Sequence, residues 1–319
     1  MEKKRFLPTI LEINIFYLII AFAWTEIGGR AQIRDMYTGI LITEYLIIFI
    51  PTLIYIKILG YDLKKVLRLN AISIKEAFKI PLIVLFSYPI LIFINGIALK
   101  ILDYFDAIKY YEMPLMPQNN TQFLITLFVG AITPGICEEV MFRGPIMRGY
   151  ERLGARKAII ISGVLFGIFH FNIQNFVGPT MLGILLGYLA YRTNSIFPSI
   201  IAHGTNNAIS FTVGYVSLRV LDRLNIDPAT NEGLQQNISS DMHTTALIIG
   251  LIFILGILLI CGLVVYNLIK SLPNREKEFK ENMELDIRHT SLLAKIISIG
   301  SLIMVGIIFV YRAHIFITR

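Results

Sequence analysis

The sequence is short of charge and of cysteine. Only 16% of its 319 residues are charged, and it contains two cysteines and one tryptophan. In an average soluble domain about a quarter of the residues are charged, so this composition argues against a soluble protein. Hydrophobic residues instead make up 55% of the chain, and the mean hydropathy is +0.67. The composition therefore predicts an integral membrane protein, whose surface contacts lipid.

The few cysteines and the positions of the basic residues argue against disulfide-linked, redox and nucleic-acid-binding proteins. Cys137 and Cys261 lie in or beside apolar segments without metal-type spacing, so neither a disulfide framework nor a redox motif is predicted. The net charge of +7 comes from Lys and Arg in short clusters between apolar runs, which predicts no nucleic-acid partner. No repeat, linker or low-complexity tract divides the chain, so residues 1–319 are predicted to form a single membrane domain.

Apolar windows of about 20 residues predict helices that cross a bilayer, because a helix satisfies its own backbone there. The expected fold class is all-α, a polytopic transmembrane helical bundle of eight to nine spans. The windows lie near residues 6–24, 37–59, 77–99, 122–141, 157–171, 176–191, 195–214, 245–269 and 291–311. The first window resembles a signal peptide, but Glu12 and Asn14 interrupt it, so we expect an uncleaved helix.

The basic clusters predict the orientation in the membrane. If the spans alternate, four clusters fall on one side of the bilayer, and the positive-inside rule makes that side cytoplasmic. They are Lys3, Lys4 and Arg5; Lys64, Lys65 and Arg68; Arg148, Arg152, Arg156 and Lys157; and Arg275, Lys277 and Lys280. We therefore expect a cytoplasmic N-terminus. The Ile, Lys and Asn-rich composition further suggests a bacterial plasma membrane.

Charged side chains inside a span are costly and mark functional candidates. Glu12 and Glu44 each stand alone in an apolar window. Single polar residues often connect neighbouring helices, so a structural role is the expected one for both.

A denser group of charges occupies residues 133–145. Glu138 and Glu139 are adjacent, and Arg143 lies four residues after Glu139, so these two side chains are predicted to face each other. Glu138 is rotated by about 100° from Glu139 and stays free for chemistry. Pro134 and Gly135 are expected to open the helix beside the pair. The alternative is an interfacial ion cluster at a helix end.

Two later segments add the groups that hydrolysis by water needs. His170 follows Phe166 by four residues, and Asn207 follows His203 by four, so each pair shares a helical face. A carboxylate can act as general base, a histidine can orient the water, and a further histidine and asparagine can donate to a developing oxyanion. No Gly-x-Ser-x-Gly motif is present, which favours activated water over a covalent intermediate. Straight spans would separate Glu138 from His170 by about ten ångströms or more.

Glu138-Glu139-x-x-x-Arg143, Phe166-x-x-x-His170 and His203-x-x-x-Asn207, in this order, resemble the three motifs of the CAAX protease and bacteriocin-processing family, also called the abortive-infectivity family, of intramembrane glutamic endopeptidases. The resemblance implies that Glu138 and His170 activate water and that His203 and Asn207 form the oxyanion hole, with Glu139 and Arg143 supporting the site. It covers a catalytic core at residues 120–215 and leaves the additional spans at 1–119 and 245–319 unassigned.

The resemblance also implies a cavity open to the cytoplasm and the bilayer, a membrane-tethered or lipidated peptide or protein as substrate, and no cofactor. Family members cut either the last three residues after a prenylated cysteine or prepeptides such as bacteriocin leaders, and the bacterial composition favours the second. A zinc hydrolase with His170, His203 and Glu138 as ligands is one alternative, although His-Glu-x-x-His is absent. A non-catalytic membrane regulator or scaffold is another, and a transporter fits less well because no inverted repeat is visible.

Overall fold

The computed structural model describes residues 7–108, 115–224, 240–275 and 291–318, and every regular element in them is a helix. The predicted all-α fold class is confirmed. Five residues of the predicted basic clusters lie outside the described residues, namely Lys3, Lys4, Arg5, Lys277 and Lys280.

The helices follow the predicted apolar windows along the chain. In order they are α1 (Ile10–Ala23), η1 (Trp24–Gly28), α2 (Gly29–Arg34), α3 (Met36–Leu41), η2 (Ile42–Phe49), α4 (Ile50–Ile58), α5 (Leu63–Val66), α6 (Ile74–Tyr104), α7 (Asn120–Thr126), η3 (Leu127–Ile132), α8 (Thr133–Met141), η4 (Phe142–Ile146), α9 (Met147–Tyr150), η5 (Glu151–Leu153), α10 (Ala155–Ile168), α11 (Val177–Thr193), α12 (Phe197–Leu224), α13 (Ser240–Lys270) and α15 (Leu292–Thr318).

Within the described residues, six helical stretches are long and apolar enough to cross a membrane. They are Ile10–Arg34, Met36–Ile58, Ile74–Tyr104, Asn120–Leu153, Ile249–Lys270 and Leu292–Ile315. The predicted count of eight to nine spans is not confirmed. α10 and α11 have only 14 and 17 residues, fewer than the roughly 20 that a crossing needs. α12 has 28 residues, but His203, Asn206 and Asn207 lower its hydropathy.

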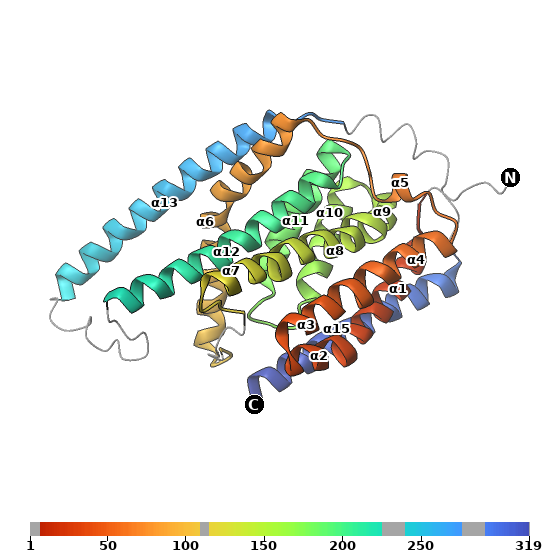
Figure 1. Cartoon of the computed structure of the whole chain (residues 1–319), viewed down its shortest axis with the longest axis horizontal. Helices are drawn as coiled ribbons and strands as arrows, with labels where there is room; N and C mark the ends of the chain where they lie inside the picture. Colours follow the sequence, from red (N-terminus) through yellow and green to blue (C-terminus); the bar gives the residue numbers. More distant parts are fainter. Residues whose placement is uncertain (1–6, 109–114, 225–239, 276–290, 319) are drawn as a thin grey trace.

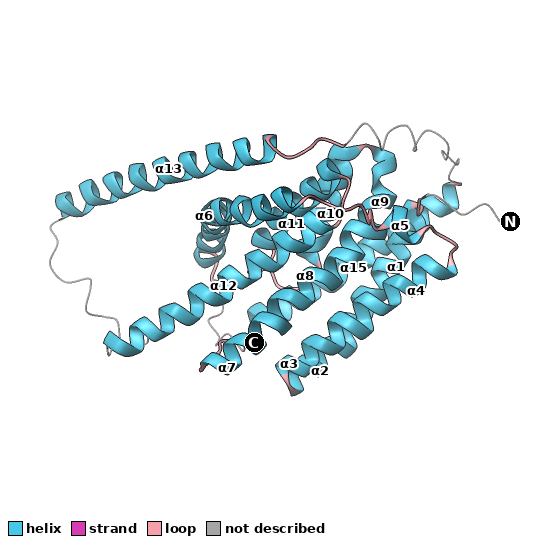
Figure 2. Cartoon of the chain, turned by 45° about the horizontal axis from the view of Figure 1, so that its top comes forward, coloured by secondary structure: helices cyan, strands magenta, loops and turns pink. Residues whose placement is uncertain are grey.

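The helices that fall short of a span lie in the middle of the bundle. Figure 1 shows α8, α10 and α11 between α6 and α13 on one side and α1, α4 and α15 on the other. The turned view in Figure 2 keeps this order, with α15 beside α1 and α13 along the opposite edge. Helices in the interior contact protein instead of lipid, so they can be shorter and more polar than the outer ones.

Close helix packing in the centre depends on glycine. A Cβ atom at Gly163 of α10 would lie 2.9 Å from the Ile184 nitrogen of α11, and one at Gly183 would lie 3.0 Å from the Gly163 Cα. Both distances are too short for a side chain, so these glycines let the two backbones touch. The contact fixes α10, which leads to His170, against α11.

Three of the predicted basic loops meet at one end of the bundle. Arg148 Nη1 donates to Glu151 Oε2 at 2.7 Å, Arg68 pairs with the same carboxylate, and Arg275 pairs with Glu76 at 3.3 Å. Arg68, Arg148 and Glu151, which we call the end cluster, are all buried. These two arginines are therefore interior ion-pair partners as well as members of the basic end that the sequence predicts.

Candidate active site

A cavity of about 630 Å³ lies among η2, α6, α8 and α12. Its polar lining consists of Gln32, Glu44, Tyr88, Asn95, Glu138, His170, Asn175, His203, Asn206, Asn207 and Ser210. Much of the remaining lining is apolar and includes Leu91, Ile92, Leu99 and Leu115. Apolar walls with a few convergent polar groups are the usual form of a binding or catalytic pocket.

Glu139 and Arg143 form the ion pair that their spacing predicts. Arg143 Nε donates to Glu139 Oε2 at 2.9 Å, and both side chains are completely buried. Arg143 Nη1 also donates to Ser162 Oγ of α10 at 2.6 Å. A buried charge is tolerated when it is paired and hydrogen-bonded in this way. Glu139 is therefore held in place behind the cavity and is not one of its lining residues.

His203 connects the two adjacent glutamates. Its Nδ1 lies 3.1 Å from Glu139 Oε1, and its Nε2 lies 3.9 Å from Glu138 Oε2. Glu139 already accepts a bond from Arg143, so we assign the hydrogen of this contact to Nδ1. Nε2 then reaches the cavity, where it can donate when the ring is protonated. We call Glu138, Glu139, Arg143 and His203 the site cluster.

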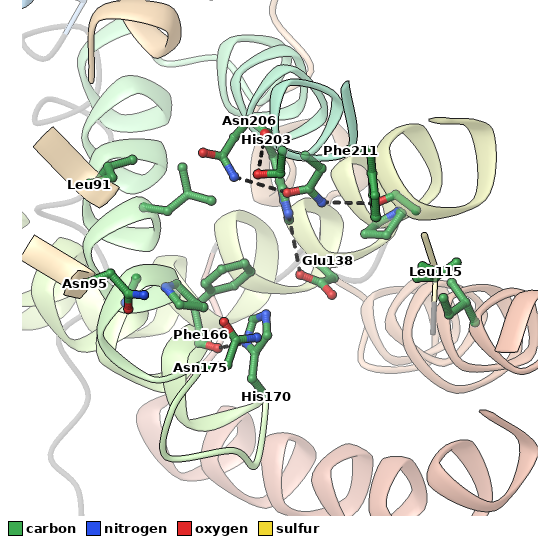
Figure 3. Close-up of a pocket in the computed structure, with 18 of the residues that line it drawn as sticks. Leu91, Asn95, Leu115, Glu138, Phe166, His170, Asn175, His203, Asn206 and Phe211 are labelled. Carbon is green, nitrogen blue, oxygen red and sulfur yellow. Dashed lines mark hydrogen bonds and ion pairs between the residues drawn. The ribbon is translucent and has the colours of Figure 1, made fainter. Parts of the chain in front are cut away.

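Of the two adjacent glutamates, Glu138 is the one that lines the cavity. Its side chain is 12% exposed, whereas that of Glu139 is 0% exposed. Across the described part of the chain, no Lys or Arg lies within ion-pair distance of Glu138, whose ion-pair contact is with His203. Figure 3 shows the Glu138 carboxylate between His203 and His170. The two adjacent glutamates therefore have different surroundings, with Glu138 at the cavity and Glu139 paired behind it.

Phe166 holds the two histidines at the site. Its ring centroid lies 5.2 Å from that of His170 and 5.4 Å from that of His203, in an edge-to-face arrangement with each. His170 Nδ1 lies 2.9 Å from the Phe166 carbonyl oxygen, which can only accept, so Nδ1 carries the hydrogen. The other nitrogen of a neutral ring is then an acceptor, suited to orienting a water molecule.

His170 and Glu138 share one cavity and interact electrostatically, although straight spans would hold them apart. α10 ends at Ile168, so His170 lies in the turn that follows the helix instead of farther along a full span. The stretch that carries Glu138 is also bent, because Gly144 has non-helical dihedral angles and Pro145 follows it. Short and bent helices bring the two groups together.

Asn207 is anchored to the helix that carries the glutamates. Its Nδ2 donates to the Gly130 carbonyl oxygen at 3.2 Å, and its Oδ1 accepts from Asn206 Nδ2 at 3.2 Å. Pro134 has no N–H, so the carbonyl four residues before it, at Gly130, lacks the usual helical donor. Asn207 supplies that donor, and the second hydrogen of its amide remains available.

Gly135 sets the distance between α8 and α12. A Cβ atom at this position would lie 3.0 Å from the Gly204 nitrogen and 3.4 Å from the Ile200 carbonyl oxygen. Such contacts with backbone cannot be relieved by moving a side chain, so the close approach requires glycine. This approach brings Glu139 within hydrogen-bonding distance of His203.

The structure thus gathers all seven predicted site residues around one cavity: Glu138, Glu139, Arg143, Phe166, His170, His203 and Asn207. It adds Ser162, Asn206 and Glu44, which the sequence analysis leaves without a site role. Glu44 is buried, lines the cavity and interacts electrostatically with Glu138. The available signal was an ionisable residue inside an apolar window. Ser162 has no comparable signal in the sequence.

The zinc alternative concerns the same side chains. Among the described residues, no group of three or more His, Cys, Asp or Glu has an arrangement that could hold a metal ion. A catalytic zinc site uses three protein ligands at about 2.0–2.3 Å. His170, His203 and Glu138 therefore do not form such a set in this structure, and the zinc alternative stays a prediction that chelation tests.

Comparison with known proteins places the site in a family context. Residues 120–209 match the family model described as type II CAAX prenyl endopeptidase Rce1-like. A curated protein of Bacillus subtilis (strain 168) named "Putative membrane peptidase YdiL" is 31% identical over 124 residues, which are 36% of this chain and 48% of that protein. The chain therefore spans about half the length of this curated relative. No solved structure matches the chain at a significant level.

The matched segment contains every residue of the three motifs. The resemblance to the CAAX protease and bacteriocin-processing family is therefore confirmed over residues 120–209. Together with the six apolar helices, the match identifies an integral membrane protein.

Proposed function

We propose that this protein is an intramembrane endopeptidase that hydrolyses a peptide bond with water activated by Glu138 and His170. The observation that carries the proposal is the position of Glu138. Its carboxylate reaches the cavity beside two histidines, while the neighbouring Glu139 is occupied by Arg143. The family match and the peptidase name of the bacterial relative support the same activity.

In the proposed reaction, Glu138 accepts a proton from a water molecule that attacks the carbonyl carbon of the substrate. His170 orients this water through its acceptor nitrogen. The carbonyl oxygen becomes an oxyanion and accepts hydrogen bonds from His203 Nε2 and from the free hydrogen of Asn207 Nδ2. The C–N bond then breaks, and the proton passes from Glu138 to the leaving amine. Water and peptide yield an acid and an amine, and Glu138 is regenerated.

Glu139 and Arg143 support this chemistry without contacting the substrate. The Glu139 carboxylate accepts from His203 Nδ1 and stabilises the protonated ring that donation from Nε2 requires. Arg143 and Ser162 fix that carboxylate in turn. Pre-positioned donors of this kind are usually the largest single contribution to acyl transfer.

The proposed substrate is a membrane-tethered peptide or protein, and a bacterial prepeptide is the class that we favour. Leu91, Ile92 and Leu99 of α6 give the cavity an apolar wall beside the polar groups, which suits an apolar or lipidated segment. We further propose a bacterial plasma membrane with the basic end of the bundle on the cytoplasmic side.

The test is cleavage of a fluorogenic, lipidated peptide by the protein purified in detergent. We expect cleavage by the wild type that persists with a chelator and is lost in Glu138→Gln and His203→Ala. Loss of wild-type cleavage on chelation would replace this mechanism by a zinc-dependent one. If the wild type cuts nothing from a broad panel of tethered peptides, and Glu138→Gln still restores function in cells that lack the protein, the role is that of a regulator or scaffold.

A further inference from the structure

Glu44 is an intramembrane carboxyl group whose surroundings differ from those of Glu12 in the first helix. Glu12 accepts bonds from the Thr9 nitrogen at 2.8 Å and from the Tyr61 hydroxyl at 2.6 Å, so it serves a helix start and a helix contact. Glu44 serves neither a helix start nor a helix contact of this kind. It lies in η2 with 5% exposure, and its Oε2 has no hydrogen-bond partner within the described residues.

The position of Glu44 places a second carboxyl group at the reaction centre. η2 packs against α8, and Glu44 and Glu138 line the same cavity. The two side chains interact electrostatically, and Cys137 of α8 lies near both. Glu139 has Arg143 as its counter-ion, but in the described part of the chain no Lys or Arg lies within ion-pair distance of Glu44.

Two adjacent carboxyl groups in an apolar surrounding cannot both be ionised, because the two negative charges repel at short distance and neither is hydrated. Pairs of this kind hold one proton between them, and their two members then have different roles in catalysis. Glu138 is the member nearer to the histidines. The proton of the pair therefore belongs on Glu44 while Glu138 is the base.

We propose that Glu44 and Glu138 form a proton-sharing carboxyl pair in which Glu44 keeps Glu138 positioned and ionised for its role as general base. The proposal rests on the proposed function of the site. Glu44 acts through Glu138 and is a positioning residue, because the substrate and the water are assigned to Glu138.

The proton movements of this scheme balance without any further reactant. At rest, Glu44 is a carboxylic acid that donates a hydrogen bond to the Glu138 carboxylate. When Glu138 takes a proton from the attacking water, both groups are neutral and the negative charge lies on the substrate oxygen. When the C–N bond breaks, Glu138 gives its proton to the amine and accepts the hydrogen bond of Glu44 again. The pair never carries two negative charges.

The groups that face this pair set its response to pH. They are Cys137 of α8, His203 of α12 and His170 after α10, with Glu139 and Arg143 behind His203. If the shared proton is needed, activity falls when it is removed at high pH. Glutamine at position 44 donates a similar hydrogen bond that no base can remove, so the part of the alkaline loss of activity that comes from Glu44 disappears.

The experiment compares wild type, Glu44→Gln, Glu44→Asp and Glu138→Gln, with Glu26→Gln as the matched control. Glu26 lies in the first helical stretch, Ile10–Arg34, whereas Glu44 lies in the second, and the Glu26 side chain is 42% exposed and pairs with Arg30 on the surface. The kcat and KM for the fluorogenic peptide are measured across the pH range in which the wild type is active. Thermal unfolding and helical circular dichroism establish that each variant is folded.

For Glu44→Gln we expect kcat to fall about tenfold to a hundredfold, with KM within about twofold and with a smaller alkaline loss of activity than in wild type. Glu44→Asp keeps an ionisable group and should retain that loss at a lower kcat, so it replaces the glutamine variant if the latter does not fold. A pH profile of Glu44→Gln with the same shape as that of Glu26→Gln would overturn the proposal.

Infrared spectroscopy gives a second readout that needs no substrate. The carbonyl stretch of a protonated carboxylic acid should be present in wild type and in Glu26→Gln and missing in Glu44→Gln. An unchanged band in Glu44→Gln would show that Glu44 does not hold the proton. If Glu138→Gln stays active in the same assay, the proposed function fails as a whole. If Glu138→Gln is inactive and Glu44→Gln behaves like the control, only this inference fails.

Discussion

The same helical stretch, Asn120–Leu153, contributes to two buried groups of charges with different properties. The site cluster and the end cluster both combine glutamate with arginine in the interior of the bundle. In the end cluster, one carboxylate lies between two guanidinium groups, and none of the three residues lines the cavity. In the site cluster, one carboxylate is paired and the other reaches the cavity. Burial and charge are therefore common to both clusters, and the proposed base is distinguished by its access to the cavity and its contact with His203.

The largest effect should come from Glu138→Gln, which removes the base and keeps the shape of the side chain. We expect kcat to fall by about 10³-fold or more, near the upper part of the range for general base catalysis. The melting temperature should stay close to that of wild type, because Glu138 has no arginine or lysine counter-ion to lose among the described residues. Cleavage assays and thermal unfolding on the same preparation check both parts. A large loss of stability would place Glu138 with the end cluster instead.

Glu151→Gln should give the opposite result. It removes the carboxylate shared by Arg68 and Arg148 and leaves two like charges buried together, which costs about 3–5 kcal/mol for a broken buried pair. We expect a markedly lower melting temperature and poor yield, with an almost normal kcat for the fraction that stays folded. Active-site titration of the folded fraction separates the two effects. An unchanged melting temperature would contradict the structural role of the end cluster.

Asn207→Ala should lower kcat by about a hundredfold, because it removes one proposed donor to the oxyanion. KM should change little, since the donor acts mainly in the transition state. Steady-state kinetics distinguish these outcomes, and Asn267→Ala is a matched control far from the cavity, in α13. A rise in KM at constant kcat would assign Asn207 to substrate binding.

The smallest effect is expected for Ser162→Ala. Without the Ser162 hydroxyl, one hydrogen bond of buried Arg143 is lost, which costs about 1–3 kcal/mol of stability. Thermal unfolding measures this loss, and cleavage should fall only several-fold because Glu139 keeps its bond from Arg143 Nε. Ser199→Ala, whose hydroxyl donates to the Ile196 carbonyl just before α12, is the control. Equal behaviour of the two variants would show that Ser162 does not support the site cluster.

Short-range spacing carried most of what the sequence predicts about the site. The four-residue spacing of Glu139 and Arg143 predicts their ion pair, and the 100° rotation of Glu138 predicts its different surroundings. Both follow from the helix alone. The positions of the helices also follow from hydropathy, because lipid selects apolar stretches wherever they pack.

Contacts between helices that are distant in the chain could not be predicted in this way. Hydropathy does not predict that η2 packs against α8. From the sequence alone, Glu44 is therefore expected to have a structural role, whereas the structure places it at the same cavity as Glu138. The predicted number of spans is also not confirmed, because interior helices such as α10 can be apolar without being long. The distance between Glu138 and His170 depends on helix ends and bends, which the rise per residue of a straight helix ignores.

The bond between Asn207 and Gly130 makes two distant positions interdependent. Pro134 cannot donate to the carbonyl of Gly130, which leaves this oxygen without its i+4 helical donor and available to Asn207. Replacing the proline would give this carbonyl a competing N–H from its own helix and would free the asparagine to turn. Pro134 and Asn207 therefore depend on each other, although they lie far apart in the sequence. A designed helical bundle that carries this site needs Pro134, Asn207 and Gly130 together.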